Sequence, residues 1–432
     1  MSEKRTVFIS FLGIGNYIDC VYAEKTSGEE ERRSGVVTFV QNALAKFYET
    51  EWTQAFILTT TDSHAKHWEA LSESWPLEKS ILERVHIPEG KNEEEIWVIF
   101  NTVYECLKEN DIVYFDITHG LRSLPLLAST LLQYAKTLKR ITVKKIFYGA
   151  FEAIPGFRGA KQLVVDIPNP SDRIAPIFDL SRYSNILDWS DAAYDFIDNG
   201  NSGRLSKLAS DELSPMLRKA QGQNNEASQL KNLINKINSF CMNIKTLRGK
   251  ALICGSEATE IIELIDNVRN SSAVFAPLKP ILTELKVAIE KTSPKREDSS
   301  NMFNAVRWCI DKGLMQEGLT LLSEGIISWF TDDEADLFDK NIREFISAYL
   351  QDQARDLSAW KKPVECGIYA GKIDTHPQCS KLKALYKNIA GIRNDINHAG
   401  MNDSPMGQDK FKAKLEELFI DAKDALYAGE TS

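Results

Sequence analysis

The sequence lacks any apolar run of the roughly 18 residues that a membrane-spanning helix needs. Its start, MSEKRTVFIS, enters a strand-like segment without the apolar core of a secretory signal, so we expect a cytoplasmic protein with no membrane attachment. An excess of positive charge is also missing, because 52 Lys and Arg stand against 61 Asp and Glu, a formal net charge of -9. This balance argues against a protein that coats nucleic acid, although a local patch still allows a transient encounter with RNA.

Closely spaced cysteines are missing as well. The chain has 7 cysteines in 432 residues and no CxxC pair, which is typical of reduced thiols rather than of a disulfide framework. Cys366, His376 and Cys379 form the one cluster to weigh as a metal site. Structural zinc usually takes four ligands, often in close pairs, so we expect no metal site.

The hydrophobic periodicity divides the chain into two expected domains, residues 1–175 and 176–432. The first alternates strand-length apolar runs with helical stretches, which predicts an α/β Rossmann-like domain with a mostly parallel sheet and helices on both faces. The second carries long amphipathic stretches without strand signals, which predicts an all-α domain. We expect strands at 6–13, 55–60, 111–118, 144–151 and 162–168, and helices at 36–49, 94–109 and 124–138.

A short glycine-containing segment follows the first expected strand. Gly13, Gly15 and Asn16 stand where a parallel sheet places its ligands, beyond the carboxyl ends of the strands, and glycine lets the backbone approach a ligand closely. The dinucleotide fingerprint GxGxxG is incomplete, because Ile18 occupies the place of its third glycine. A nucleotide-dependent oxidoreductase is therefore disfavoured.

A second polar segment follows the strand DIVYFD. Thr118, His119, Gly120 and Arg122 bring a hydroxyl, an imidazole, a flexible residue and a guanidinium to the start of an apolar helix. The N-terminus of a helix favours anions, so this set is a candidate phosphate-binding constellation. The structural alternative is that Thr118 caps the helix while His119 and Arg122 are solvated.

The stretch DITHG at residues 116–120 matches the DxTHG signature of CRISPR-associated proteins, and FLGIGNY and FYGAFEA lie where that family has similar strand ends. The chain resembles the ancillary ribonucleases of type III CRISPR systems over its whole length, since DWSDAAYDFIDNG and RWCIDKGLMQEGLTLLSE are similar to helices of their second half. In those proteins an N-terminal CARF domain binds cyclic oligoadenylate across a two-fold dimer interface, and a C-terminal HEPN domain cleaves RNA.

The resemblance implies roles for the residues at the strand ends. Gly13, Gly15 and Asn16 would line the floor of the ligand site. The phosphates or riboses of cyclic tetra- or hexa-adenylate would be contacted by Thr118, His119, Gly120 and Arg122. Arg122 can offer a planar fork of donors to phosphate oxygens. No cofactor is required beyond the cyclic oligoadenylate, which acts as an allosteric activator.

The segment Arg393-Asn394-Asp395-Ile396-Asn397-His398 fits the R-x4-6-H pattern of HEPN ribonucleases, in which a polar residue commonly follows the arginine. The resemblance implies that Arg393, Asn394 and His398 are catalytic, on a helix at about 380–399. Histidine can act as general acid or base, and arginine can hold the phosphate. RNA supplies its own nucleophile, the 2'-OH, so no metal is needed.

The spacing of the pair bears on assembly. Five residues rotate by about 140° along a helix, so Arg393 and His398 do not converge on one phosphate within one chain. Two copies facing each other across a two-fold axis would unite them, as HEPN nucleases are understood to do, which implies a homodimer or a larger even-numbered homo-oligomer. The structural alternative is a histidine that favours the negative end of the helix dipole, with Gly400 as the C-cap.

The function expected from the sequence is a cyclic-oligoadenylate-activated, metal-independent endoribonuclease that cleaves single-stranded RNA in type III CRISPR antiviral defence. The expected products are a 2',3'-cyclic phosphate and a 5'-hydroxyl. One alternative is a CARF sensor, or a protein that sequesters the messenger, with an inactive HEPN domain. Another is a ring nuclease that degrades the messenger at Thr118, His119 and Arg122.

Overall fold

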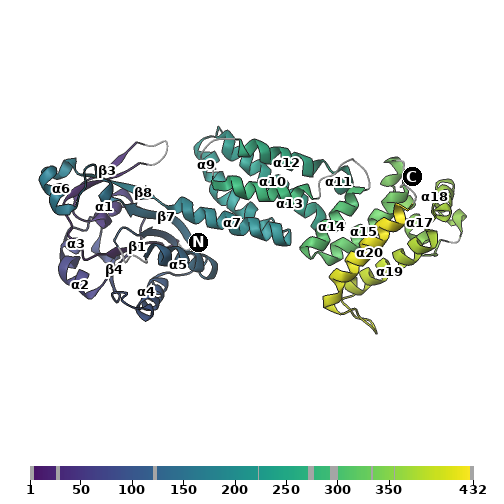
Figure 1. The fold of residues 1–432 in the computed structure, drawn as a ribbon, viewed down its shortest axis with the longest axis horizontal. Helices are drawn as coiled ribbons and strands as arrows, with labels where there is room; N and C mark the ends of the chain where they lie inside the picture. The colour runs from purple at the N-terminus through teal and green to yellow at the C-terminus, as the bar shows by residue number, and fades with distance from the viewer. Residues whose placement is uncertain are drawn as a thin grey trace. The chain divides into compact units, whose positions relative to one another are not determined.

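The computed structural model describes residues 4–25, 30–119, 124–221, 223–270, 277–291, 300–331, 334–354 and 356–428. The chain divides into two compact units, Met1–Leu187 and Asp188–Ser432. The first unit carries the sheet, and the second unit consists of helices (Figure 1). Helix α7, Ser181–Asn199, contains the boundary between them. None of the helices in the described ranges is long and apolar enough to span a bilayer.

The described residues of the first unit form one eight-stranded sheet in the order β3-β2-β8-β7-β6-β1-β4-β5. The neighbours β7, β6, β1, β4 and β5 run parallel, β8 runs antiparallel to β7, and β2 and β3 form an antiparallel pair at the edge. The strands are β1 Thr6–Leu12, β2 Cys20–Glu24, β3 Arg32–Val37, β4 Gln54–Thr59, β5 Leu82–His86, β6 Ile112–Asp116, β7 Thr142–Gly149 and β8 Ile174–Asp179.

Helices cover both faces of this sheet because its strands are apolar on both sides. Along β1, Phe8 packs into one buried cluster with residues of α1, whereas Val7 and Ile9 pack into another with residues of α4 and α5. The expected α/β layer is thus confirmed. Its helices are α1 Val40–Phe47, α2 Thr61–Ser63, a π-helix His64–Trp68, α3 Glu69–Glu73, α4 Glu93–Cys106, α5 Leu124–Leu138 and α6 Ala160–Asp166, with 3-10 turns at Lys79–Ile81, Phe151–Ala153 and Pro170–Asp172.

Several local predictions for this unit were wrong. Residues 162–168 were expected as a strand, but most of them belong to α6, because a short apolar run alone does not separate strand from helix. The helix expected from residue 36 begins at Val40, since Val36 and Val37 belong to β3. Strands β3 and β5 carry charged, exposed residues typical of sheet edges and gave no apolar signal. The domain boundary expected after residue 175 falls within β8, a strand of the same sheet.

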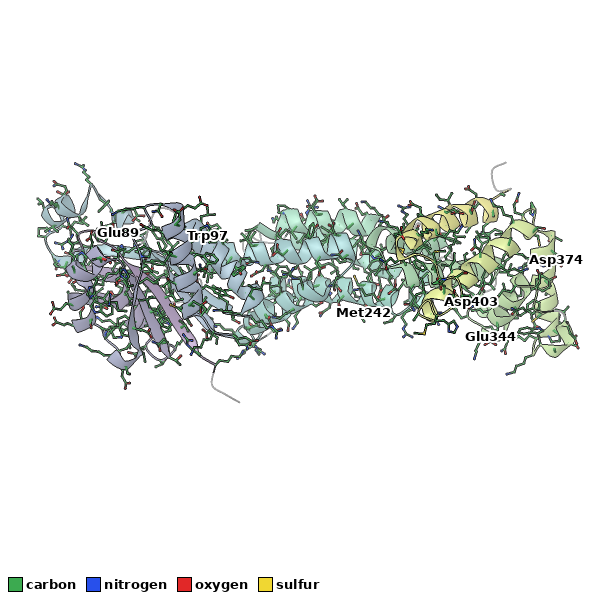
Figure 2. All side chains as sticks on the ribbon, turned by 90° about the horizontal axis from the view of Figure 1, so that it is seen from below. Glu89, Trp97, Met242, Glu344, Asp374 and Asp403 are labelled. Atoms are coloured by element: carbon green, nitrogen blue, oxygen red, sulfur yellow. The ribbon has the colours of Figure 1, made fainter. Side chains whose placement is uncertain are left out.

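The second unit is helical, as expected, and its buried side chains form one continuous cluster from Trp189 to Leu426. Some apolar side chains stay exposed, among them Trp97 on α4 in the first unit and Met242 on α10 in the second (Figure 2). After α7 the helices are α8 Gly203–Leu208, a π-helix Ala209–Leu213, α9 Ser214–Lys219, α10 Asn225–Lys245, α11 Gly249–Cys254, α12 Ser256–Arg269, α13 Lys279–Glu290, α14 Ser300–Lys312, α15 Met315–Phe330, α16 Glu334–Leu337, α17 Lys340–Leu350, α18 Pro363–Thr375, α19 Cys379–Asn397 and α20 Phe411–Leu426.

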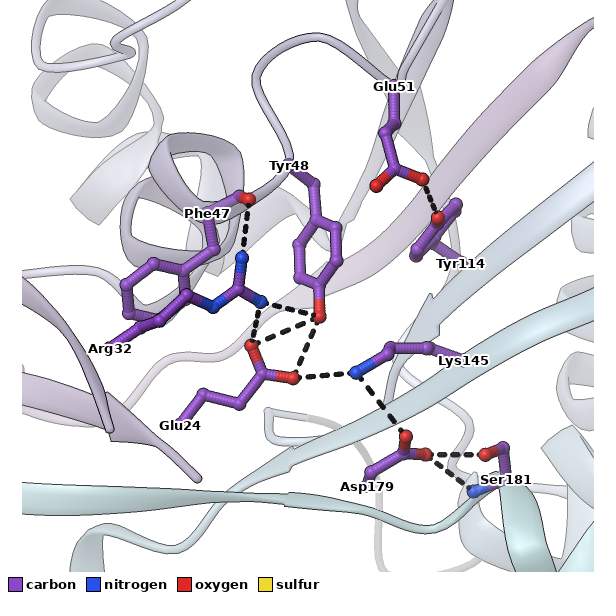
Figure 3. Close-up of polar contacts among 9 residues, drawn as sticks. All are labelled: Glu24, Arg32, Phe47, Tyr48, Glu51, Tyr114, Lys145, Asp179 and Ser181. Carbon is purple, nitrogen blue, oxygen red and sulfur yellow. Dashed lines mark hydrogen bonds and ion pairs between the residues drawn. The ribbon is translucent and has the colours of Figure 1, made fainter. Parts of the chain in front are cut away.

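A buried charge cluster ties the edge hairpin to the rest of the first unit (Figure 3). Glu24 at the end of β2 is 2% exposed and accepts hydrogen bonds from Lys145 at 2.8 Å, from the Tyr48 hydroxyl at 2.7 Å and from Arg32. Burial by itself would raise the pKa of Glu24, but the bonds from Lys145, Tyr48 and Arg32 outweigh it and lower the pKa. Two cations and a hydroxyl thus hold the carboxylate in its ionised form.

The same lysine reaches the beginning of α7. Lys145 pairs with Asp179 at 3.4 Å, and Asp179 accepts hydrogen bonds from the Ser181 backbone N–H at 3.0 Å and from its hydroxyl at 2.6 Å (Figure 3). A carboxylate at the start of a helix satisfies backbone donors that the helix leaves free. One charged side chain on β7 therefore connects the edge hairpin and the start of α7.

Candidate functional site

The candidate ligand site lies at the carboxyl ends of β1 and β6, which are parallel neighbours. Apart from the β2–β3 hairpin, the chain builds β4 and β5 on one side of β1 and then β6 and β7 on the other side, so the strand order reverses between β1 and β6. In open α/β sheets, ligands bind in the crevice at this reversal. A Cβ atom placed on Gly13 would lie 3.4 Å from His119 Cβ, so the two predicted segments are in contact there.

Asp116, the last residue of β6, fixes the loop that follows it. Its buried carboxylate accepts hydrogen bonds from the Ser10 hydroxyl at 2.7 Å, from the Thr118 backbone N–H at 3.0 Å and from the Thr118 hydroxyl at 2.5 Å. Burial raises the pKa of Asp116, and the bonds from Thr118 and Ser10 oppose this rise. Gln41 on α1 continues the network by donating to Ser10 and to the Phe11 carbonyl, both at 3.0 Å.

Thr118 also connects the loop to β7. Its hydroxyl accepts a hydrogen bond of 2.7 Å from the backbone N–H of Gly149 while it donates to Asp116. A Cβ atom on Gly149 would lie only 2.8 Å from Cγ2 of Val40 and 3.2 Å from the Tyr22 ring, so no side chain fits there. Among the described residues the Thr118 hydroxyl bonds to Asp116 and Gly149. The residues that a helix cap would contact, 120–123, lie outside them.

His119 packs within an aromatic group at the crevice. Its ring meets the Tyr17 ring edge-on at 4.8 Å, and Tyr17 meets His67 in the same way at 4.7 Å. The Tyr17 ring is also tilted against Phe39 at 4.9 Å. Burial lowers the pKa of His119 to about 4, with the charge of Glu152 opposing and His67 assisting this shift. The imidazole is therefore neutral at pH 7, and its buried Nε2 atom has no hydrogen-bond partner among the described residues.

The glycine loop after β1, residues 13–16, is held by hydrogen bonds from two side chains that follow β4, a third strand. Lys66 Nζ donates to the Ile14 carbonyl at 2.9 Å and to Asn16 Oδ1 at 3.2 Å, and His67 Nε2 donates to the Gly15 carbonyl at 2.9 Å. Gly15 and Asn16 are exposed. Sequence reasoning missed Lys66 and His67, although their position just after β4, at the same edge of the sheet, was a usable signal. Of the other predicted ligand residues, Gly120 and Arg122 lie outside the described residues.

The candidate nuclease residues lie at the end of α19. Helix α19 ends at Asn397, and His398 follows as its C-cap. The N–H of Gly400 bonds to the Asp395 carbonyl at 2.8 Å and the N–H of Ala399 to the Ile396 carbonyl at 3.0 Å, the two bonds of a Schellman motif. Ala399, rather than the expected Gly400, occupies its left-handed position, with φ of 55°.

The side chains of this helix end point in different directions. One apolar face of α19 is buried at Leu382, Leu385, Ile389 and Ile392 and half-buried at Ile396. Asn394 and His398 are exposed. Arg393 is half-buried, and its Nε atom is buried without a hydrogen-bond partner in the described part of the chain. Asn397 accepts a hydrogen bond from Gln316 of α15 at 3.2 Å. No contact between described residues joins Arg393 to His398.

The cysteine and histidine cluster near α18 was weighed as a metal site. His376 Nδ1 accepts a hydrogen bond from the Gln378 backbone N–H at 3.1 Å, and its ring packs edge-on against Trp329 at 5.3 Å. Cys366 is fully buried. Within the described ranges, no three His, Cys, Asp or Glu side chains converge as a metal site would require.

Comparison with known proteins fits this geometry. Residues 7–152 match the family model of the CARF domain of the CRISPR system endoribonuclease Csx1. Residues 185–298 match the family model of the second domain of the CRISPR-associated protein MJ1674. The first unit is therefore a CARF domain, and both matching family models describe CRISPR-associated proteins. Neither family match extends to α19.

One curated relative is the CRISPR-associated protein MJ1674 of Methanocaldococcus jannaschii. It is 26% identical to this chain over 242 residues, which are 55% of this chain and 32% of the relative. The match thus spans about a third of the relative's length.

Proposed function

We propose that this protein is a cytoplasmic endoribonuclease that a cyclic oligoadenylate activates, as part of type III CRISPR defence. The observation that carries the proposal is the meeting of the glycine loop and the DITHG segment at the strand-order reversal of a CARF sheet. The name of the matching family, an endoribonuclease, supports a nuclease activity for the whole chain.

The crevice has the chemistry that a ring of phosphodiesters and adenosines requires. Lys66 supplies a cation at its rim, and Arg122, four positions after Thr118 in the sequence, would supply a planar fork of donors. The neutral imidazole of His119 keeps an unpartnered nitrogen at the floor. The exposed backbone at Gly15 lies in open space, where a ligand can approach it closely.

The helix end at Arg393 to His398 supplies the groups for RNA cleavage. The RNA 2'-oxygen attacks the adjacent phosphorus, and the bond to the 5'-oxygen breaks. His398 takes the proton of the 2'-OH or gives one to the leaving 5'-oxygen, while Arg393 holds the charged phosphate. Asn394 lies about 40° from His398 around the helix and can orient the RNA beside it.

Within one chain, Arg393 and His398 lie on different faces of α19. Because Arg393 and His398 lie about 140° apart on one helix, a composite site needs α19 of a second copy. We therefore propose a homodimer, or a larger even-numbered assembly, with the RNA bound between two helical units. Products are a 2',3'-cyclic phosphate and a 5'-hydroxyl, and DNA resists because it lacks the 2'-OH.

The test uses labelled single-stranded RNA, EDTA, and cyclic tetra- or hexa-adenylate with the full chain. Wild type is expected to cleave only when the messenger is present, and His398→Ala is expected to be inactive. His86→Ala is the matched control, since His86 is an exposed histidine at the end of β5. If the messenger binds but wild type leaves RNA intact, the protein is a sensor or a sequestering protein. If the messenger itself is consumed, a ring nuclease replaces the proposal.

A further inference from the structure

Two side chains outside the DITHG and glycine segments reach into the same crevice. Lys66 and His67 lie on the π-helix His64–Trp68, which follows β4, the neighbour of β1. Thr60 and Ser63 form a capping box that starts this segment directly at the strand end, with bonds of 3.2 Å and 3.0 Å. A π-helical turn is rare and occurs frequently at functional sites. The segment is thus fixed at its base and directed toward the glycine loop.

The contacts of Lys66 leave its charge uncompensated. The ammonium group lies on two neutral acceptors, the Ile14 carbonyl at 2.9 Å and Asn16 Oδ1 at 3.2 Å. No carboxylate of the described residues forms an ion pair with it. A phosphate oxygen carries a negative charge that neither of these neutral acceptors has, so it would attract the ammonium group more strongly and displace them.

His67 has a different place in the crevice. Burial has the largest effect on the pKa of His67 and lowers it. The charge of Lys66 lowers this pKa further, while the hydrogen bond to Gly15 opposes the shift. The ring is therefore neutral at pH 7, and the 2.9 Å contact fixes Nε2 as the atom that carries the hydrogen. Through this bond His67 turns the Gly15 carbonyl toward the π-helix and away from the open side of the loop.

We infer that Lys66 binds a phosphate of the cyclic oligoadenylate and that His67 positions the glycine loop that receives it. This inference rests on the proposed function of the crevice and extends it to a third strand end. On binding, Lys66 exchanges the Ile14 and Asn16 acceptors for a phosphate oxygen. His67 keeps its bond to Gly15 and holds the loop in place, because its neutral ring does not compete for the anion.

The experiment measures messenger affinity of the full chain at several salt concentrations. Lys66→Ala is expected to weaken binding by about 10- to 100-fold, the effect of losing a hydrogen bond between charged groups. It should also lower the slope of log Kd against log salt, because one charge pair with the messenger is lost. Lys66→Arg should restore most of the affinity. Lys79→Ala is the control, since it removes the same charge from an exposed position elsewhere in the unit.

The histidine requires a different readout, because it acts through the loop. His67→Ala should weaken binding without changing the salt slope, and His67→Gln, which keeps a donor, should recover affinity. If Lys66→Ala binds as tightly as wild type, or if Lys79→Ala weakens binding equally, the inference about Lys66 is overturned while the sensor function stands. If His67→Ala binds as wild type does, the role given to His67 is wrong. If wild type binds no messenger, both the inference and the proposed function fail.

Discussion

The hydroxyl of Thr118 and the backbone N–H of Gly149 are joined by a hydrogen bond of 2.7 Å, which links the loop after β6 to the end of β7. Since the same hydroxyl donates to the buried carboxylate of Asp116, one side chain holds two strand ends together. The threonine of DITHG thereby shapes the crevice as well as lining it.

Replacing Thr118 by valine is expected to destabilise the protein by about 1–3 kcal/mol, because the variant leaves the Gly149 N–H without its partner and removes one of the two hydrogen bonds that Thr118 donates to Asp116 Oδ1. Thr118→Ser should stay close to wild type, since it retains the hydroxyl. Urea unfolding of both variants checks this. A valine variant as stable as wild type would show that the bond contributes nothing.

Gly149→Ala is expected to cost about 1–3 kcal/mol, because the added methyl group would meet Val40 at 2.8 Å. In the double variant with Val40→Ala the two effects should be less than additive, since the smaller residue makes room. Thermal melting of the four proteins gives the coupling. Strict additivity would mean that the contact with Val40 does not exclude a side chain.

The charge cluster around Glu24 predicts a dependence of stability on pH. The folded-state pKa of Glu24 is lowered from its ordinary value of 4.5, so its contribution is complete above that pH and is lost as pH falls through the folded pKa. As pH drops below about 4.5, stability should therefore fall more steeply in wild type than in Glu24→Gln. At pH 7 that variant should be about 3–5 kcal/mol less stable, because Lys145 and Arg32 lose their buried partner. Equal pH profiles would contradict the assignment.

Ala399 adopts a left-handed conformation at the end of α19, with φ of 55°. This conformation costs an alanine about 1 kcal/mol and costs glycine nothing, so Ala399→Gly should raise stability by about that amount. The control is Ala384→Gly, an exposed site within the same helix, which should lower stability by about 1 kcal/mol. If both variants shift the melting temperature in the same direction, the helix does not end as described.

The sequence allowed the sheet and the edge with the candidate site to be predicted, because β1, β4 and β6 are apolar runs that are almost wholly buried. Strand β7 ends in the apolar stretch IFYG, which gave a similar signal. The sequence did not reveal β3 and β5, whose edge positions demand little apolar character. It also missed Lys66 and His67, since HAKHW carries no recognisable motif and only the neighbouring positions of β4 and β1 bring it to the crevice.

In the helical unit, too, some features could be predicted from the sequence and others could not. The apolar residues from Leu382 to Ile396 recur at helical spacing, and all of them are buried except Ile396, which is half-buried. The positive φ of Ala399 was not predicted, because the glycine at 400 is the residue that usually takes it. The pairing of Arg393 and His398 remains a prediction, since it depends on a second copy of α19.

The most direct test of the account is the rate of RNA cleavage with and without cyclic oligoadenylate, measured in EDTA together with messenger affinity. The account predicts that the messenger accelerates cleavage by wild type, with 2',3'-cyclic phosphate products. It also predicts that His398→Ala binds the messenger as tightly as wild type but does not cleave. Messenger-dependent cleavage by His398→Ala, or wild type that binds the messenger and leaves RNA intact, would contradict the account.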